Sequence, residues 1–231
     1  MMAGVEEADV KQLVIAVLAA GMALGAHAAD ARRSVTEKIE WTYTDRPEKP
    51  VAGLPNVLMV GDSITRAYYS AVAKALEGKA NVYYLATSCS VGDERLRPQI
   101  ADYYRMIGVR FDVVHFNNGM HGWGYTEEEY RRYFPELIAA VRAGAPKAKL
   151  VWATVTPVRK DKEGGATNAR IEERNRIAGE FVAKAGIPTD DQHALMMAHQ
   201  DLHADDVHYT AEGSEIQGRQ VAESVEKALA K

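Results

Sequence analysis

Ser63, Asp205 and His208 are the residues of this chain whose types and spacing best suit nucleophilic chemistry. Ser63 lies in VLMVGDSIT, where an apolar segment ends at Gly61 and a helical pattern begins, so it is expected beside free backbone N–H groups. His208 lies in DDVHYTAEG, and Asp205 precedes it by three residues, a spacing that lets a carboxylate orient the imidazole in a turn. A serine becomes a nucleophile when a neighbouring base accepts its proton. The three residues therefore predict acyl transfer.

Each part of this interpretation has an alternative. Serine is a good helix N-cap, so Ser63 is equally well explained as a capping residue. The sequence DDQH gives Asp190 the same spacing to His193 that Asp205 has to His208. His193 is followed by ALMMA, which is typical of a packed segment, and His208 is therefore the favoured base.

Two further segments offer groups that stabilise the negative oxygen formed during acyl transfer. The first, TSCSVGDERL, contains Gly92, whose backbone N–H can approach a substrate without a side chain in the way. The second, FNNGMHGW, contains Asn117, Asn118 and His121. Asparagine also satisfies turns locally, and His121 is predicted either to line the pocket or to lie on a surface loop.

The elements that must position these residues alternate between strands and helices. Continuous apolar runs predict strands over residues 56–60, 81–86, 111–116 and 149–154, and helical patterns cover residues 65–76, 95–107, 126–143, 168–185 and 211–230. Strands without in–out alternation indicate a sheet covered on both faces. The pattern predicts an α/β fold with a doubly wound, mainly parallel sheet, in which ligands bind beyond the carboxyl ends of the strands.

Composition narrows the class of protein. The chain has 231 residues, a net charge of −4 and a pI near 6.0, with 47% hydrophobic residues. This favours one domain with a sizeable core and argues against nucleic acid as a partner, because no basic excess is present to neutralise phosphates. Cys89 is the single cysteine, so an intrachain disulfide is excluded.

The first residues predict export. Residues 13–25 are an unbroken apolar run, too short for a stable membrane span, and Ala26-His27-Ala28 has the form of a signal-peptidase site. We therefore predict a signal peptide over residues 1–28, cleaved near Ala28, with the protein periplasmic or secreted and not stably inserted in a membrane afterwards. The acidic start MMAGVEEADVK departs from the usual basic region; the alternatives are an uncleaved anchor or a misassigned start. Residues 29–54 are predicted to be an arm or linker, and residues 55–231 the domain.

Gly61-Asp62-Ser63, a glycine loop, asparagine after the third strand and Asp205-x-x-His208 before the last helix together resemble the SGNH (GDSL-type) hydrolase superfamily, over roughly residues 55–228. The resemblance implies a flavodoxin-like three-layer α/β/α fold and a serine ester hydrolase without a metal or organic cofactor. It implies Ser63 as nucleophile, His208 as base and Asp205 as its orienting acid. It also implies an oxyanion hole made by the backbone N–H groups of Ser63 and Gly92 and an asparagine side chain. The segment FNNGMH after the third strand departs from the family's usual Gly-x-Asn-Asp. It is similar to a branch of the family that reads F-N-x-G-L-H, which favours Asn117 over Asn118 as the donor.

The nearest-looking relatives act on acetylated carbohydrates, so the resemblance implies a short-acyl ester of a small molecule or polysaccharide as substrate. Trp123, Tyr125, Tyr68 and Tyr69 are candidates to stack on sugar rings, with core packing as the alternative. The sequence leaves the oligomeric state open.

Two rival functions use other features. The run HQDLHADDVH, residues 199–208, is rich in metal-ligating side chains and would suit a metal-dependent hydrolase. That interpretation does not explain the segment Gly61-Asp62-Ser63. The other rival is a non-catalytic carbohydrate-binding protein on the same fold, which would bind without turnover.

Overall fold

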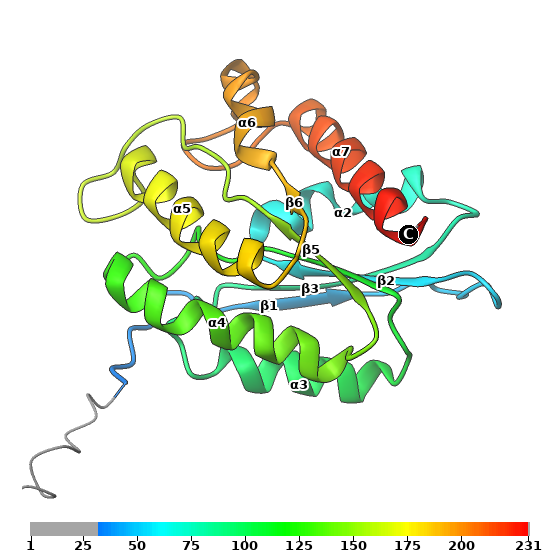
Figure 1. Cartoon of the computed structure of the whole chain (residues 1–231). Coiled ribbons are helices and arrows are strands. Elements are labelled where there is room, and N and C mark those ends of the chain that lie inside the picture. The colour runs from blue at the N-terminus through cyan, green and yellow to red at the C-terminus, as the bar shows by residue number, and fades with distance from the viewer. Residues whose placement is uncertain (1–31, 231) are drawn as a thin grey trace, which may run out of the picture. The chain divides into compact units, whose positions relative to one another are not determined.

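Six strands from the described part of the chain form one sheet, in the order β1-β3-β2-β4-β5-β6 (Figure 1). The structure, a computed structural model, describes residues 32–230, so the predicted signal peptide lies outside the described residues. The strands are β1 (Thr42–Asp45), β2 (Asn56–Gly61), β3 (Asn81–Thr87), β4 (Val113–Phe116), β5 (Lys149–Ala153) and β6 (Thr189–Asp190). β1 runs antiparallel to β3 and all other neighbours are parallel. The carboxyl ends of β2 to β6 therefore share one edge.

The sheet is covered on both faces because its central strands are apolar throughout. The helices are α2 (Ser63–Ala75), α3 (Leu96–Ile107), α4 (Glu127–Gly144), α5 (Asn168–Lys184), α6 (Gln192–Met197) and α7 (Ala211–Leu229), with a 3₁₀ helix η1 (Gln200–Leu202). Side chains of α3, α4 and α5 form one buried cluster with β2–β5, and those of α2 and α7 form another with the opposite face. Figure 1 shows α3 and α4 on one side of the sheet and α2 and α7 on the other. This three-layer α/β/α arrangement confirms the predicted fold class.

Capping residues set the boundaries of α4 and α7. Thr126 caps α4 in a capping box, in which its hydroxyl accepts from the Glu129 N–H and the Glu129 carboxylate accepts from the Thr126 N–H. Thr210 caps α7 by accepting from the Gly213 N–H. The observed boundaries of the main helices and strands lie within two residues of the predicted ones. This precision matters at α7, because its first turn directly follows His208.

Several short elements are absent from the sequence prediction, namely β1, β6, α6 and η1. β1 lies in the segment predicted to be an arm or linker, and its four residues are all exposed. It pairs with the edge of β3 through backbone hydrogen bonds, so no apolar pattern marks it. β6 has two residues and α6 has six, lengths at which hydrophobic periodicity carries little information.

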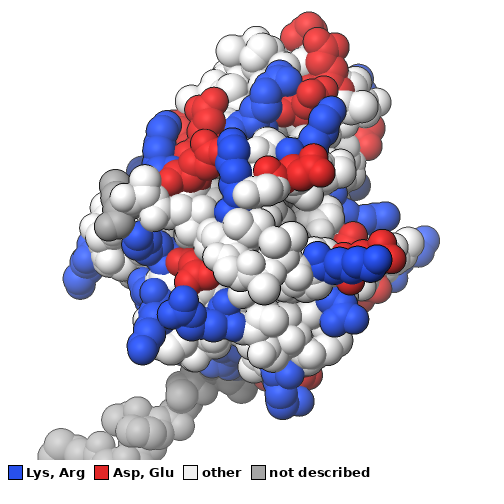
Figure 2. Space-filling view, turned by 90° about the vertical axis from the view of Figure 1, so that its right-hand side faces the viewer, with Lys and Arg blue, Asp and Glu red and all other residues white. Residues whose placement is uncertain are grey.

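Acidic and basic side chains are interspersed on the face of the molecule that Figure 2 shows, around uncharged surface. No helix within residues 32–230 is long and apolar enough to cross a membrane.

Candidate active site

Ser63 is the first residue of α2 and stands at the carboxyl end of β2. The helix is capped by Asp62, whose Oδ1 accepts a hydrogen bond of 3.0 Å from the Ile64 N–H, so Ser63 is not the N-cap residue. Gly61 is required by close packing, because a Cβ there would lie 2.0 Å from Thr65 Oγ1. This arrangement leaves the Ser63 hydroxyl free to point away from the helix and its N–H without an intrahelical partner.

His208 is held by a short closed loop before α7. The loop is closed at its base by a β-bridge between His203 and Tyr209, whose rings stack with centroids 4.2 Å apart. Tyr209 Oη donates a 3.0 Å hydrogen bond to the Pro157 carbonyl, which ties the loop to the segment after β5. The Ala204 N–H donates to the His208 carbonyl at 2.8 Å. The imidazole therefore projects from a braced turn.

Ser63, His208 and Asp205 form one hydrogen-bonded chain. Ser63 Oγ lies 2.7 Å from His208 Nε2, and His208 Nδ1 lies 2.9 Å from Asp205 Oδ2. Asp205 Oδ1 accepts from the backbone N–H groups of Val207 and His208, both at 2.7 Å. Partial burial would raise the pKa of Asp205, but the two backbone N–H groups and the imidazole outweigh it and lower that pKa to about 2. The structure thus brings a hydroxyl, an imidazole and a carboxylate together in the order that serine acyl transfer needs.

The sequence also places Asp190 three residues before His193. In the structure the Asp190 carboxylate contacts His115 instead. Asp190 Oδ2 lies 2.9 Å from Nε2 of His115 on β4, and both side chains are fully buried. Asp190 also accepts from Gln192 and Gln220. His193 lies in α6, whose residue Met196 is buried, as expected of a packed segment. Of the two histidines, His208 is the one that contacts Ser63.

Gly92 lies on the loop after β3, directly against an aromatic ring. A Cβ at this position would lie 2.7 Å from the ring of Tyr125, so glycine alone lets the two loops pack this closely. Asn118 braces the same loop: its Oδ1 accepts from the Val91 N–H at 3.0 Å and its Nδ2 donates to the Cys89 carbonyl at 2.8 Å. The backbone at Gly92 is thereby fixed from two sides.

Asn117 is oriented differently from its neighbour. Its Nδ2 donates a 2.7 Å hydrogen bond to the carbonyl of Ala153, at the carboxyl end of β5. It lines a cavity of about 10 Å³, room for one water, together with Asp62 and Thr65. A carboxamide has two N–H groups, and this contact uses one of them. Asn117 therefore lies beside the first turn of α2, with one of its two amide N–H groups used in the contact with Ala153.

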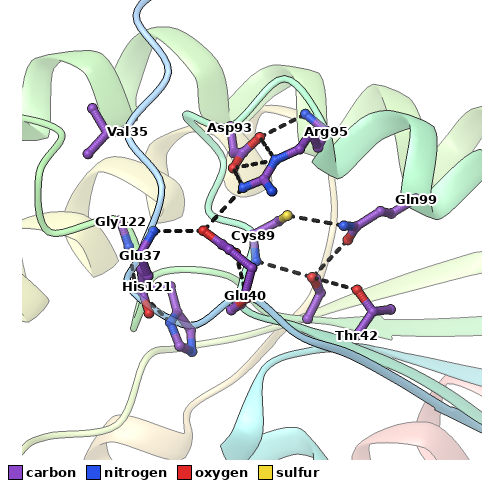
Figure 3. A network of polar contacts seen from close by, with 12 residues as sticks. Val35, Glu37, Glu40, Thr42, Cys89, Asp93, Arg95, Gln99, His121 and Gly122 are labelled. Carbon is purple, nitrogen blue, oxygen red and sulfur yellow. Dashed lines mark hydrogen bonds and ion pairs between the residues drawn. The ribbon is translucent and has the colours of Figure 1, made fainter.

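His121, the other candidate, faces the N-terminal arm. Its Nδ1 donates to Glu37 Oε1 at 2.9 Å (Figure 3). Its ring meets Trp41 edge-on with centroids 5.6 Å apart. Burial would lower the pKa of His121, but Glu37 and the more distant carboxylates of Asp62 and Glu40 outweigh it and raise that pKa. His121 is thus paired with the arm and is 15% exposed.

The predicted sugar-stacking aromatics are mostly part of the core. Tyr68 and Tyr125 are 2% and 3% exposed, and Tyr69 packs on Tyr84 with centroids 4.4 Å apart. Trp123 is partly exposed, with the Arg174 guanidinium 4.0 Å from its ring centroid. Core packing, the alternative for these residues, accounts for Tyr68 and Tyr125.

Sequence reasoning missed the acidic residues of the arm that touch these loops, Glu37 and Glu40. Their contacts join residues 48 and 84 positions apart, and no local pattern marks them. The run at residues 199–208 is arranged differently from a metal site: within residues 32–230 no three His, Cys, Asp or Glu side chains come together as metal ligands would.

Comparisons with known proteins show what this chain is similar to in sequence and in fold. The model of the GDSL-like lipase/acylhydrolase family matches residues 59–216, more than half of the chain, and the match spans Ser63, Asp205 and His208. A search of curated protein sequences found no match.

Several solved structures share the fold. A member of the lipolytic G-D-S-L family from Veillonella parvula is 18% identical with a TM-score of 0.57, over 73% of this chain and 96% of its own. A carbohydrate esterase family 3 protein from Talaromyces cellulolyticus is 16% identical with a TM-score of 0.59, over 77% and 99%. An acetyl xylan esterase is 16% identical with a TM-score of 0.57, over 74% and 99%.

Proposed function

This chain belongs to the GDSL-like lipase/acylhydrolase family and is a serine ester hydrolase, and on that premise we propose that Ser63 is its nucleophile, His208 its general base and Asp205 the acid that orients the base. The observation that carries the proposal is the 2.7 Å contact between Ser63 Oγ and His208 Nε2. The 2.9 Å contact of His208 Nδ1 with Asp205 supports it, because a proton held on Nδ1 leaves Nε2 free to accept.

The reaction proceeds in two halves. His208 Nε2 takes the proton of Ser63 as Oγ attacks the ester carbonyl carbon, and the carbonyl electron pair moves onto oxygen. Collapse of this intermediate breaks the ester bond, and the alcohol leaves with the proton from His208. Water then attacks the acyl-serine and gives its proton to His208. Collapse of this second intermediate breaks the bond to Ser63 Oγ, which takes that proton back from His208, and the acid is released.

The negative oxygen formed in each half needs fixed donors. We propose the backbone N–H groups of Ser63 and Gly92 and the second amide N–H of Asn117. Ser63 contributes as the first residue of α2, where the helix dipole also favours negative charge. Asn118 is assigned the bracing of the Gly92 loop, because both ends of its amide are used for that purpose.

The substrate we propose is an acetyl or other short-acyl ester of a carbohydrate outside the cytoplasm. The acetyl xylan esterase and the carbohydrate esterase that share the fold support a carbohydrate ester. The apolar run and Ala26-His27-Ala28 support export with cleavage near Ala28. Sequencing the N-terminus of protein recovered after export tests the cleavage: a start near Ala29 agrees with it, and retention of residues 1–28 contradicts it.

A panel of p-nitrophenyl esters from acetate to decanoate, beside acetylated xylan, tests the substrate. We expect kcat/KM to be highest for acetate, acetate to be released from xylan, and Ser63→Ala to remove both activities while a chelator leaves them unchanged. A folded protein that preferred decanoate and released no acetate would contradict the short-acyl assignment. Activity that survived Ser63→Ala and was lost with the chelator would favour the metal-dependent alternative.

A further inference from the structure

The N-terminal arm crosses two loops at the carboxyl edge of the sheet (Figure 3). We call residues 35–41 the strap, residues 88–95 the β3 loop and residues 117–125 the β4 loop. The β3 loop carries Gly92 and the β4 loop carries Asn117, so the strap lies over the segments that carry the proposed oxyanion hole. The contacts that follow all join parts of the compact unit that begins at Ser34.

The strap holds the β4 loop at two points. Glu37 Oε1 accepts from His121 Nδ1 at 2.9 Å and from the Gly122 N–H at 3.3 Å. The Val35 N–H donates to Tyr125 Oη at 2.9 Å. Burial would raise the pKa of Glu37, but its contacts with His121 and Gly122 outweigh it and lower that pKa, so the carboxylate is charged. Hydrogen bonds to a charged acceptor are the stronger kind.

The strap also holds the β3 loop. Glu40 Oε2 accepts from Ser88 Oγ at 2.7 Å, and Glu40 Oε1 lies 3.1 Å from Arg95. Arg95 in turn binds both carboxylate oxygens of Asp93, the residue after Gly92 (Figure 3). Glu40 is thus linked through Arg95 to Asp93, the residue that follows Gly92.

We call Glu37 and Glu40 the two anchors of the strap; they are joined to each other, and the contacts of the strap lead from both sides to Gly92. The Glu37 N–H donates to Glu40 Oε1 at 2.7 Å, so the two acids form one unit. Tyr125, held by the strap, packs its ring directly against Gly92. The residues between the anchors face solvent: Lys38 is exposed and Ile39 is 71% exposed. The inward contacts of the strap are therefore concentrated on the two loops.

We propose that Glu37 and Glu40 are positioning residues that set the distance between the β3 and β4 loops, and thereby the aim of the Gly92 N–H at the developing oxyanion. The inference rests on the oxyanion hole assigned under the proposed function. Its physical basis is that a displacement of about 1 Å at such a donor costs on the order of 10²-fold in rate. Because Glu37 and Glu40 touch the loops and not the reacting atoms, they act through Gly92.

The test compares Glu37→Ala, Glu40→Ala, the double variant and Glu37→Gln with the control Glu48→Ala, an exposed acid beyond β1. Kinetics on p-nitrophenyl acetate, run well below the lowest melting temperature of the set, are paired with inhibition by phenylboronic acid, which forms a tetrahedral adduct with the serine. We expect kcat to fall about tenfold in each single alanine variant and about 10²-fold in the double variant. KM should stay within about twofold, and the Ki for the boronic acid should rise in the same proportion as kcat falls.

Glu37→Gln should recover most of the rate, because an amide oxygen still accepts from Gly122 and His121, and Glu48→Ala should match the wild type. A double variant with kcat and Ki within about twofold of the wild type would overturn the proposal. So would a rise in KM alone, which would place the strap in substrate binding. If the wild type hydrolysed no acetate ester, the substrate assignment would fail, and the rate at which a fluorophosphonate modifies Ser63 would replace kcat in the same comparison.

Discussion

Two histidine–aspartate pairs with the same 2.9 Å contact differ in everything around them. We call Asp205–His208 the rim pair and His115–Asp190 the core pair. The side chains of the rim pair are 58% and 41% exposed, and its histidine meets Ser63. Those of the core pair are 1% and 0% exposed.

Solvent exposure and the other groups that the pair contacts, and not the histidine–aspartate contact itself, decide whether such a pair serves catalysis or stability. At the rim, the free ring nitrogen of His208 faces a hydroxyl at the edge where ligands bind. In the core, Asp190 is surrounded by Gln192 and Gln220, so its contacts connect β4, β6, α6 and α7. Changes to the rim pair should therefore alter rate, and changes to the core pair should alter stability.

The largest expected effect is on the serine that the rim pair meets. Ser63→Ala should lower kcat for p-nitrophenyl acetate by about 10⁴-fold or more, since it removes the nucleophile. The melting temperature should stay near that of the wild type, because Asp62, and not Ser63, caps α2. A variant with more than a tenth of the wild-type kcat would break the assignment of the rim.

Asp205→Asn should lower kcat by about 10²- to 10³-fold, because an amide holds the wrong tautomer of His208. The loss is expected to be smaller than the ~10⁴-fold loss seen for a buried triad acid, since water partly replaces this exposed carboxylate. Asp206→Asn is the matched control, with the same change one residue along. Its ion pair with Arg159 is exposed and of little energetic value, so kcat should stay within about twofold. Equal losses in both variants would mean that the loop, and not the carboxylate of Asp205, matters.

The core pair should show the opposite response. His115→Leu leaves the Asp190 carboxylate buried without its partner, and the free energy of unfolding should fall by about 3 kcal/mol. The folded protein should keep its kcat within about threefold. Urea unfolding and kinetics on the same preparation measure both, with His193→Leu, a partly exposed histidine, as the control for the substitution. Loss of kcat with unchanged stability would place the core pair in the chemistry.

The smallest expected effect is the response to acid. Burial would raise the pKa of Asp190, but His115, Gln220 and Gln192 outweigh it and hold that pKa below its ordinary 3.8. A lowered carboxyl pKa contributes stability above pH 3.8 that is lost as pH falls through the lowered value. Asp190→Asn should therefore flatten the loss of unfolding free energy below about pH 4. Asp205→Asn should flatten it less, because solvent screens the rim pair. If acid destabilised Asp190→Asn more steeply than the wild type, the Asp190 pKa would have to be raised by folding and not lowered.

The contacts of the rim pair with Ser63 could be predicted from the sequence, whereas those of the core pair could not, and the reason is physical. Ser63, Asp205 and His208 stand at local boundaries, one at a strand–helix junction and two in a turn before a capped helix. Such boundaries can be recognised from the local sequence around them. His115 and Asp190 are 75 residues apart, and the spacing of Asp190 to His193 suggests a local partner that the fold does not use.

The same reason explains why the sequence predicts an arm or linker over residues 29–54 but not the strand β1 or the contacts of the arm. β1 is exposed and polar, and it is held by backbone pairing to β3. Glu37 and Glu40 resemble ordinary solvated acids in the sequence, and their partners become visible only when the loops after β3 and β4 are brought to the same edge. The choice between Asn117 and Asn118 also depends on side-chain direction, which adjacent identical residues cannot reveal.

The central claim is that Ser63 is the nucleophile activated at the rim, and peptide mapping by mass spectrometry after brief incubation with diisopropyl fluorophosphate tests it most directly. We predict a single phosphorylated peptide carrying the adduct on Ser63, formed much more slowly in His208→Ala and at the wild-type rate in His193→Leu. An adduct on another residue, or none on folded and active wild-type protein, would contradict the claim.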